Sequence, residues 1–128
     1  PKYLFSKGFS KSKILFGMHK VNKIDTLYIV EGALDCMWLS QYGYPAVAIL
    51  GATISRRQIE LLSVLGPHEI VLALDNDDAG SRGKEKASFD MSNRFLISYL
   101  NIPKKYKDLQ EITDTNTLHT VLNSKVLI

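Results

Sequence analysis

Two apolar runs that end abruptly in carboxylates constrain the fold of this chain more than any other feature. Residues 28–30 lead into Glu31, and residues 70–74 lead into Asp75 and Asp77. A short apolar run that ends at acidic residues is typical of a buried parallel strand that delivers its last side chains to the carboxyl edge of a sheet. Open α/β sheets bind their ligands at that edge. The sequence therefore predicts an α/β fold with an acidic site where two strands end.

The acidic residues of this predicted edge indicate a divalent metal ion. Carboxylates held close together repel one another unless they are protonated or share a cation. Mg²⁺ prefers oxygen ligands, so a magnesium site at Glu31, Asp75 and Asp77 is the simplest interpretation. Asp35 follows Glu31 by one helical turn, so both side chains can face the same pocket. Two structural alternatives stay open. Asp35 can simply stabilise the start of a helix, and residues 76–80 have the composition of a loop.

The length and composition suit one compact domain. A chain of 128 residues, 45% of them apolar, can bury a core of its own. No apolar stretch approaches the ~20 residues that span a bilayer, and no signal-peptide core is present, so a cytoplasmic protein without a membrane partner is expected. Cys36 is the only cysteine, which excludes a disulfide framework and a zinc ribbon within this chain. We expect Cys36 to be buried on an apolar helix.

The positive charge of the chain is concentrated near its N-terminus. The net charge is only +3, but residues 1–25 contain six lysines and one acid, Asp25. The lysines are Lys2, Lys7, Lys11, Lys13, Lys20 and Lys23. A basic segment of this kind favours a phosphate backbone as its partner, and the binding should depend on salt. The alternative is an ordinary solvated segment.

Apolar periodicity and capping residues predict alternating strands and helices. Strands are expected at 26–30, 46–50, 69–74 and 95–102, and 14–16 is a further candidate strand. Helices are expected at 33–42, 55–65 and about 79–91, followed by a short last helix that Asp114 caps and that reaches Asn123. Ser55 and Gln58 have the spacing of a capping box at the start of the second helix. This alternation predicts a parallel sheet with helices on both faces.

The two acidic motifs, in this order and each after an apolar strand, resemble the Toprim domain. That domain is shared by bacterial and phage primases, type IA and type II topoisomerases and related nucleases. The matching residues are Val30-Glu31-Gly32-x-x-Asp35 and Asp75-x-Asp77-x-Ala79-Gly80. A narrower likeness to DnaG-type primases is carried by Pro1-Lys2-Tyr3-Leu4, Lys11-Ser12-Lys13-Ile14-Leu15-Phe16-Gly17 and Leu50-Gly51-Ala52-Thr53. The resemblance covers roughly residues 1 to 112.

This resemblance implies a fold, a reaction and a cofactor. The fold would be a Toprim (Rossmann-like) parallel sheet flanked by helices over residues 26–128, preceded by the basic segment 1–25. The reaction would be synthesis of RNA primers on a single-stranded DNA template from ribonucleoside triphosphates, as in the catalytic core of a DNA primase. Glu31, Asp75 and Asp77 would be catalytic and would hold Mg²⁺ or Mn²⁺. In the two-metal scheme one ion activates the primer 3′-hydroxyl and the other neutralises charge on the triphosphate.

The resemblance also suggests outer residues of the site. Asp35 and Asp108 are further candidate metal ligands. Gln110 stands where DnaG-type primases usually carry a second aspartate, and an amide is a poorer metal ligand than a carboxylate. The expected contacts to template or nucleotide are Lys2, Lys11, Lys13 and Arg82. Ordinary surface charge is the alternative for Arg82 and for Asp108. The expected protein partner is a replicative helicase, bound through regions outside this chain.

Two other functions fit the same pattern. A Toprim nuclease or topoisomerase fragment would use the same carboxylates to cleave phosphodiesters, and a topoisomerase would need a nucleophilic tyrosine on another domain. A receiver-like signalling domain also carries acids at strand ends, but no lysine follows the fourth predicted strand where its chemistry needs one. The start at Pro1, inside a family-like segment, indicates a catalytic-core fragment of a longer protein.

Overall fold

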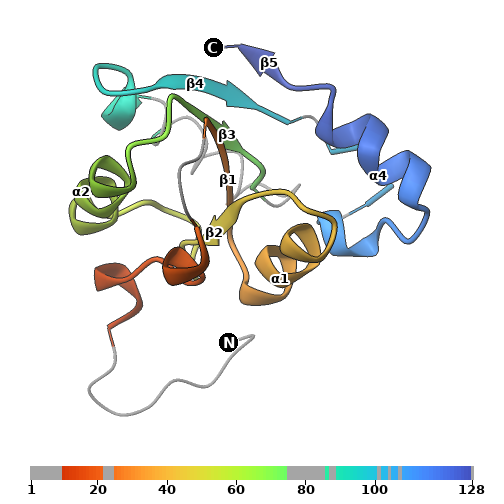
Figure 1. The fold of residues 1–128 in the computed structure, drawn as a ribbon, viewed down its shortest axis with the longest axis horizontal. Coiled ribbons are helices and arrows are strands. Elements are labelled where there is room, and N and C mark those ends of the chain that lie inside the picture. Colours follow the sequence, from red (N-terminus) through yellow and green to blue (C-terminus); the bar gives the residue numbers. More distant parts are fainter. Residues whose placement is uncertain are drawn as a thin grey trace.

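One sheet organises the part of the chain that the structure describes. The computed structural model describes residues 10–21, 25–74, 86, 89–100, 102–103, 105–106 and 108–127. Within these residues five strands form the sheet, in the order β2-β1-β3-β4-β5 (Figure 1). The strands are β1 (Thr26–Val30), β2 (Ala46–Ala48), β3 (Glu69–Leu72), β4 (Leu96–Tyr99) and β5 (Val126–Leu127). The helices are α1 (Ala33–Gln41), α2 (Arg56–Leu65) and α4 (Thr115–Leu122), with 3₁₀ helices η1 (Lys11–Lys13), η2 (Met18–Lys20) and η3 (Leu109–Glu111).

The four strands β1 to β4 are parallel, as the sequence predicts. β1 lies between β2 and β3, where Ile29 is opposite Val47 on one side and Leu72 on the other. β4 continues the parallel order beyond β3. β5 is an addition that the sequence did not predict, and it pairs antiparallel with β4 at the edge of the sheet. Its two residues are exposed, so apolar periodicity gave no sign of it.

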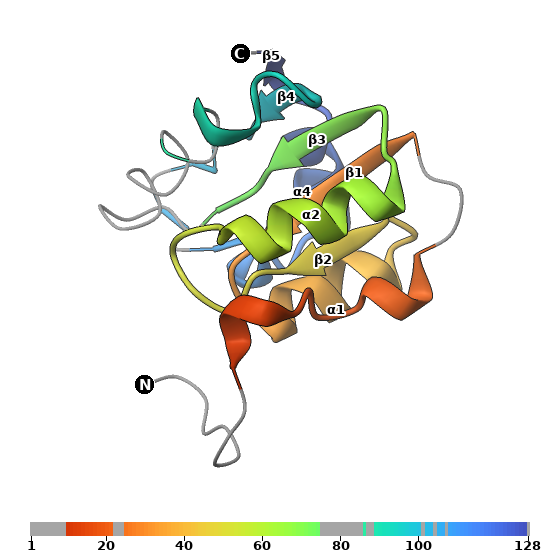
Figure 2. The ribbon, with the colours of Figure 1, turned by 90° about the vertical axis from the view of Figure 1, so that its left-hand side faces the viewer.

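Helices cover both faces of the sheet, as buried parallel strands require. Leu27 and Ile29 of β1 face the core that α2 closes, whereas Tyr28 and Val30 face the core that α1 and α4 close. Figure 2 shows α2 in front of the sheet and α4 behind it. All four of these side chains are buried, which explains why β1 is a continuous apolar run and not an alternating one. None of the described helices is both long and apolar enough to cross a membrane.

The helix starts predicted from capping residues are confirmed. Ser55 Oγ accepts a hydrogen bond from the Gln58 backbone N–H (3.1 Å), and Gln58 Oε1 accepts one from the Ser55 N–H (3.0 Å). This reciprocal pair is the capping box of α2. Asp114 caps α4 by accepting from the Thr117 N–H at 3.0 Å. Local polar chemistry therefore determines where these two helices begin.

Several predicted boundaries were wrong at the ends of strands. β2 ends at Ala48 and not at residue 50, because Leu50 adopts a left-handed backbone with φ of 60°. β3 and β4 are also shorter than predicted. The candidate strand at 14–16 is reduced to one antiparallel bridge, between Phe16 and Ala48. Of the helix predicted at about 79–91, the described residues 86 and 89–91 are helical, and the rest lies outside the described residues.

A buried carboxylate ties the edge strand β5 to the middle of the sheet. Glu69, the first residue of β3, accepts hydrogen bonds from Ser98 Oγ and Lys125 Nζ at 2.5 Å each, and from Thr26 Oγ1 at 3.4 Å. Burial acts to raise the pKa of Glu69, but the hydrogen bonds from Lys125 and Ser98 outweigh it and lower that pKa below its ordinary value. The carboxylate is therefore stabilised in its charged form.

Replacement of Lys125 is expected to make folding less stable at neutral pH only. Because the pKa of Glu69 is lowered on folding, its network adds stability above the ordinary value of 4.5 and loses it as the pH falls through the folded pKa. Lys125→Met should lower the free energy of unfolding by about 1 kcal/mol at pH 7, a figure discounted for solvent screening because the Lys125 side chain is 38% exposed. Urea unfolding at neutral and at acidic pH measures the loss at pH 7 and its expected disappearance in acid.

The matched control is Arg57→Met, which breaks the exposed pair of Arg57 and Glu60 on α2. Both side chains of that pair are at least half exposed, so the change should leave stability within about 0.5 kcal/mol at any pH. A loss for Lys125→Met that is equally large in acid would contradict the assignment of the effect to Glu69.

Candidate functional site

The order of the strands creates a natural ligand site at the carboxyl ends of β1 and β3. From β1 the chain passes to β2 on one side of the sheet and then crosses to β3 on the other. In open α/β sheets this reversal leaves a crevice between the two strands, outside their carboxyl ends. The Ala73 N–H donates to the Ile29 carbonyl at 2.8 Å, so the pairing persists to the ends of both strands. The acidic motifs that the sequence singled out follow these two ends.

Glu31 lies directly at this crevice. It is the first residue after β1, its side chain is partly exposed, and its carbonyl accepts a 2.7 Å hydrogen bond from the Leu50 N–H. Gly32 then begins α1 without a side-chain cap, its backbone still extended. The backbone of Glu31 is thus held by the end of β1, by the turn into α1 and by the hydrogen bond from Leu50 in the loop after β2.

Asp35 lies in the first turn of α1 and is only 3% exposed. A carboxylate near a helix N-terminus is favoured by the helix dipole, which suits the structural alternative. A buried acid one turn from Glu31 also suits the ligand interpretation, because both supply the oxygen atoms that hard cations prefer. Asp35 is therefore a buried acid in the first turn of α1, and its role as a metal ligand stays a prediction.

The remaining acids of the predicted cluster fall outside the described residues. Leu74 is the last described residue before Asp75, and Asp77 follows two residues later. Lys2 and Arg82 also lie outside them. Among the residues that the structure describes, no three side chains of histidine, cysteine, aspartate or glutamate gather in a way that could hold a metal ion. The predicted cluster of Glu31, Asp75 and Asp77 stays a prediction.

Asp108 has a structural role that the sequence did not indicate. It is 6% exposed, so it is not a surface aspartate, and its Oδ1 accepts a hydrogen bond from the Glu111 N–H at 3.2 Å. This contact caps η3, the short helix that packs against α1. Gln110 lies within η3 and is partly buried. The Oδ1 atom of Asp108 is thus engaged by the backbone of η3, and its role as a metal ligand stays a prediction.

The basic segment reaches the same edge of the sheet as Glu31. η1 packs on the N-terminal end of α2, and that end follows the carboxyl end of β2. The Cε and Nζ atoms of Lys11 each lie 4.0 Å from the position that a Cβ would occupy on Gly51. Gly51 directly follows Leu50, whose N–H binds the Glu31 carbonyl. Lys11 and Lys13 are both exposed, and Lys11 lies beside the loop that binds the backbone of Glu31.

Two features of this edge are not predictable from the sequence. Leu50 is 7% exposed and has a left-handed backbone, a conformation that costs a bulky residue about 1–3 kcal/mol and that clusters at functional sites. Gln58, interpreted only as a capping residue, also binds the backbone of the basic segment. Nothing local in the sequence signals either feature, because both depend on contacts with distant parts of the chain.

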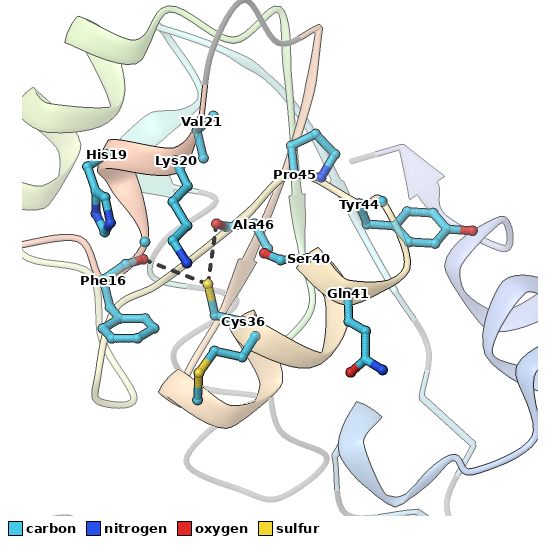
Figure 3. A pocket seen from close by; sticks show the side chains of 13 residues that line it. Phe16, His19, Lys20, Val21, Cys36, Ser40, Gln41, Tyr44, Pro45 and Ala46 are labelled. Carbon is cyan, nitrogen blue, oxygen red and sulfur yellow. Dashed lines mark hydrogen bonds between the residues drawn. The ribbon is translucent and has the colours of Figure 1, made fainter.

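The described residues also line a cavity of about 680 Å³, away from this edge. It lies beside the start of β2 and the C-terminal half of α1, between Lys20, Ser40 and Pro45 (Figure 3). Cys36 lines this cavity and donates a hydrogen bond to the Ala46 carbonyl at 3.3 Å. Burial raises the pKa of the Cys36 thiol to about 11, so it stays protonated at neutral pH and is no nucleophile. Its predicted burial is confirmed.

Known proteins resemble this chain in sequence over most of its length. A family model described as Toprim-like matches residues 28–113. A DNA primase from Synechococcus elongatus is 42% identical over 117 residues, which cover 80% of this chain and 17% of that protein. A DNA primase from Thermotoga maritima is 36% identical over 120 residues, which cover 88% of this chain and 21% of the relative. The chain thus spans about a fifth of the length of the curated relatives it matches.

The fold also has a solved counterpart. The crystal structure of a DNA primase domain from Pseudomonas aeruginosa superposes with a TM-score of 0.79 and 25% sequence identity. The match covers 99% of this chain and 44% of that structure. The mixed α/β architecture described above is therefore shared along almost the entire chain.

Proposed function

Because this chain belongs to the Toprim-like family, we propose that it is the Toprim catalytic domain of a DnaG-type DNA primase, which synthesises RNA primers on single-stranded DNA. The observation that supports the proposal is the placement of Glu31 directly after β1, at the switch point between β1 and β3. The Asp75-x-Asp77 motif follows Leu74 in the sequence, and the Lys11 side chain lies beside Gly51. The likeness to primases from two bacteria supports the reaction.

The proposed metal site consists of oxygen donors from two strand ends. Glu31, Asp75 and Asp77 would bind Mg²⁺ or Mn²⁺, and Asp35 and Asp108 would lie farther out. Three of these residues, Glu31, Asp35 and Asp108, lie among the described residues. They suit such an ion, because they offer carboxylate oxygens and no sulfur. Bound there, a divalent ion would supply Lewis-acid stabilisation of the charge on the reacting phosphate. Gln110 would leave the outlying position with one carboxylate fewer than in related primases.

The other proposed residues act on the phosphates of the substrates. Lys11 is exposed beside the crevice, so its ammonium can pair with the triphosphate of an incoming nucleotide or with the template backbone. Lys2, Lys13 and Arg82 are proposed to extend this contact. The proposed partners are therefore single-stranded DNA and ribonucleoside triphosphates. We also propose a replicative helicase as partner through other parts of the full-length protein, which would work in the cytoplasm.

A primer-synthesis assay on the full-length protein tests the function. We expect labelled ribonucleotides to be incorporated into short RNA on a single-stranded template, and only with a divalent metal. Cleavage of the template without RNA synthesis would favour the second candidate, a Toprim nuclease or topoisomerase fragment. If the protein neither synthesises RNA nor cleaves the template with any divalent metal, both candidate functions are contradicted.

Manganese is expected to bind at Glu31 and not at another acidic site. Crystals soaked in Mn²⁺ should show anomalous density within coordination distance of at least two of Glu31, Asp75 and Asp77, since a shared cation offsets their repulsion. In solution, Glu31→Gln should weaken Mn²⁺ binding in a titration, whereas Asp114→Asn on α4 should not. Density at other acids, with none at this edge, would contradict the metal assignment.

A further inference from the structure

We propose that Gln58 is a positioning residue, which holds the backbone of Lys11 so that the lysine side chain stands at the carboxyl edge of the sheet. The inference rests on the proposed function, because it explains how the Lys11 ammonium is held beside the proposed acidic site. Capping of α2 is the ordinary role of such a glutamine. The side chain of Gln58 also forms hydrogen bonds with segments outside α2, which a cap does not require.

The amide group of Gln58 joins three segments of the chain. Its Nε2 donates to the carbonyls of Lys11 (3.2 Å), Ile14 (2.9 Å) and Ile49 (3.0 Å). The first two carbonyls belong to the basic segment, more than 40 residues away in the sequence, and the third follows β2. An amide nitrogen has two hydrogens, so one of them is shared between two acceptors. The residue is 1% exposed, so no water replaces these bonds.

The orientation of the amide is determined by its neighbours. Three carbonyl oxygens surround Nε2, and the backbone N–H of Ser55 points at Oε1 (3.0 Å). Only a side chain with both a donor and an acceptor at its end satisfies all four groups. A glutamate would place an oxygen against the three carbonyls, and an apolar side chain would leave them without a donor.

The position of Lys11 follows from this anchor. Its carbonyl is held by Gln58, and its Nζ extends to within 4.0 Å of the Cβ position on Gly51. Ser55 Oγ supports the same segment by donating to the Ser12 carbonyl. A lysine whose backbone is held loses less freedom when it binds a phosphate than a lysine on a loose segment. Gln58 therefore acts through Lys11, without touching the substrate.

The test is a double-mutant cycle on the full-length protein with single-stranded DNA as the probe. Lys11→Ala should weaken binding roughly threefold to tenfold and reduce the slope of log affinity against log salt by about one unit. Gln58→Met, which removes the donor and keeps the length, should produce the same direction of change. The double variant should bind no more weakly than Lys11→Ala, because the two residues act in series.

A separate readout keeps the test valid if stability also falls. Hydrogen exchange should increase in residues 10–16 of Gln58→Met and not in Lys11→Ala. Asp114→Ala removes the cap of α4, far from the site, and should lower stability without changing the salt slope. If Gln58→Met does not fold, Gln58→Asn serves as the second variant, because it keeps the amide group on a side chain one methylene shorter, which cannot reach all of these carbonyls.

The outcomes separate this inference from the proposed function. Losses that multiply in the double variant, or an unchanged salt slope in Gln58→Met, would overturn the positioning role even if primer synthesis is confirmed. The cycle measures DNA binding alone, so it remains decisive for Gln58 if the carboxylates prove to serve cleavage and not synthesis.

Discussion

Glu31→Gln and Asp77→Asn are each expected to reduce primer synthesis by the full-length protein about a hundredfold or more. Both changes preserve the shape of the side chain but remove the charge that would bind the metal. Glu31 directly follows β1 at the switch point of the sheet, where ligands of such folds bind. The measurement is incorporation of labelled ribonucleotides on a single-stranded template.

Stability should move in the opposite direction. If Glu31, Asp75 and Asp77 form the proposed cluster, removing one negative charge relieves repulsion in the absence of metal, so thermal unfolding of both variants should occur at the wild-type temperature or slightly above it. Glu60→Gln is the matched control, because Glu60 is half exposed on α2 and outside the site. Wild-type synthesis by the two site variants, or a loss explained by unfolding, would refute the catalytic assignment.

Gly17→Ala is expected to lower the free energy of unfolding by about 2–4 kcal/mol. Gly17 has a φ of 84°, and a Cβ there would lie 2.9 Å from Cys36 Sγ and 3.4 Å from the Ala46 carbonyl oxygen. The side chain of Cys36 is buried and hydrogen-bonded to Ala46, so it has little freedom to move away. Urea unfolding monitored by circular dichroism measures the loss.

Gly43→Ala separates the two causes of this loss. Gly43 has the same φ of 84°, but a Cβ there would meet nothing within 4 Å. Its replacement should cost only the backbone strain, about 1–2 kcal/mol. Cys36→Ala should recover part of the loss of Gly17→Ala, because it removes the nearer clashing atom. Equal losses at Gly17 and Gly43 would show that packing against Cys36 is unimportant.

Features that depend on neighbouring residues could be predicted from the sequence alone. β1 begins and ends where its apolar run predicts, and the capping residues Ser55 and Asp114 begin α2 and α4 as expected. Cap bonds and strand burial act over a few residues, so the chemistry is visible in the chain itself. The acidic motif at Glu31 was found for the same reason, because an apolar strand that ends in a carboxylate is a local pattern.

The way in which these elements meet depends on contacts between distant residues, and it could not be predicted from the sequence. The tertiary structure placed β1 between β2 and β3, ended β2 early at the left-handed Leu50 and added β5 at the edge. It also brought the amide of Gln58 to the backbone of Lys11, and Lys125 to Glu69. The contacts of Gln58 with Lys11 and of Lys125 with Glu69 join residues more than 40 positions apart, so no local period or spacing encodes them. They form only when the burial of two apolar faces brings the distant segments together.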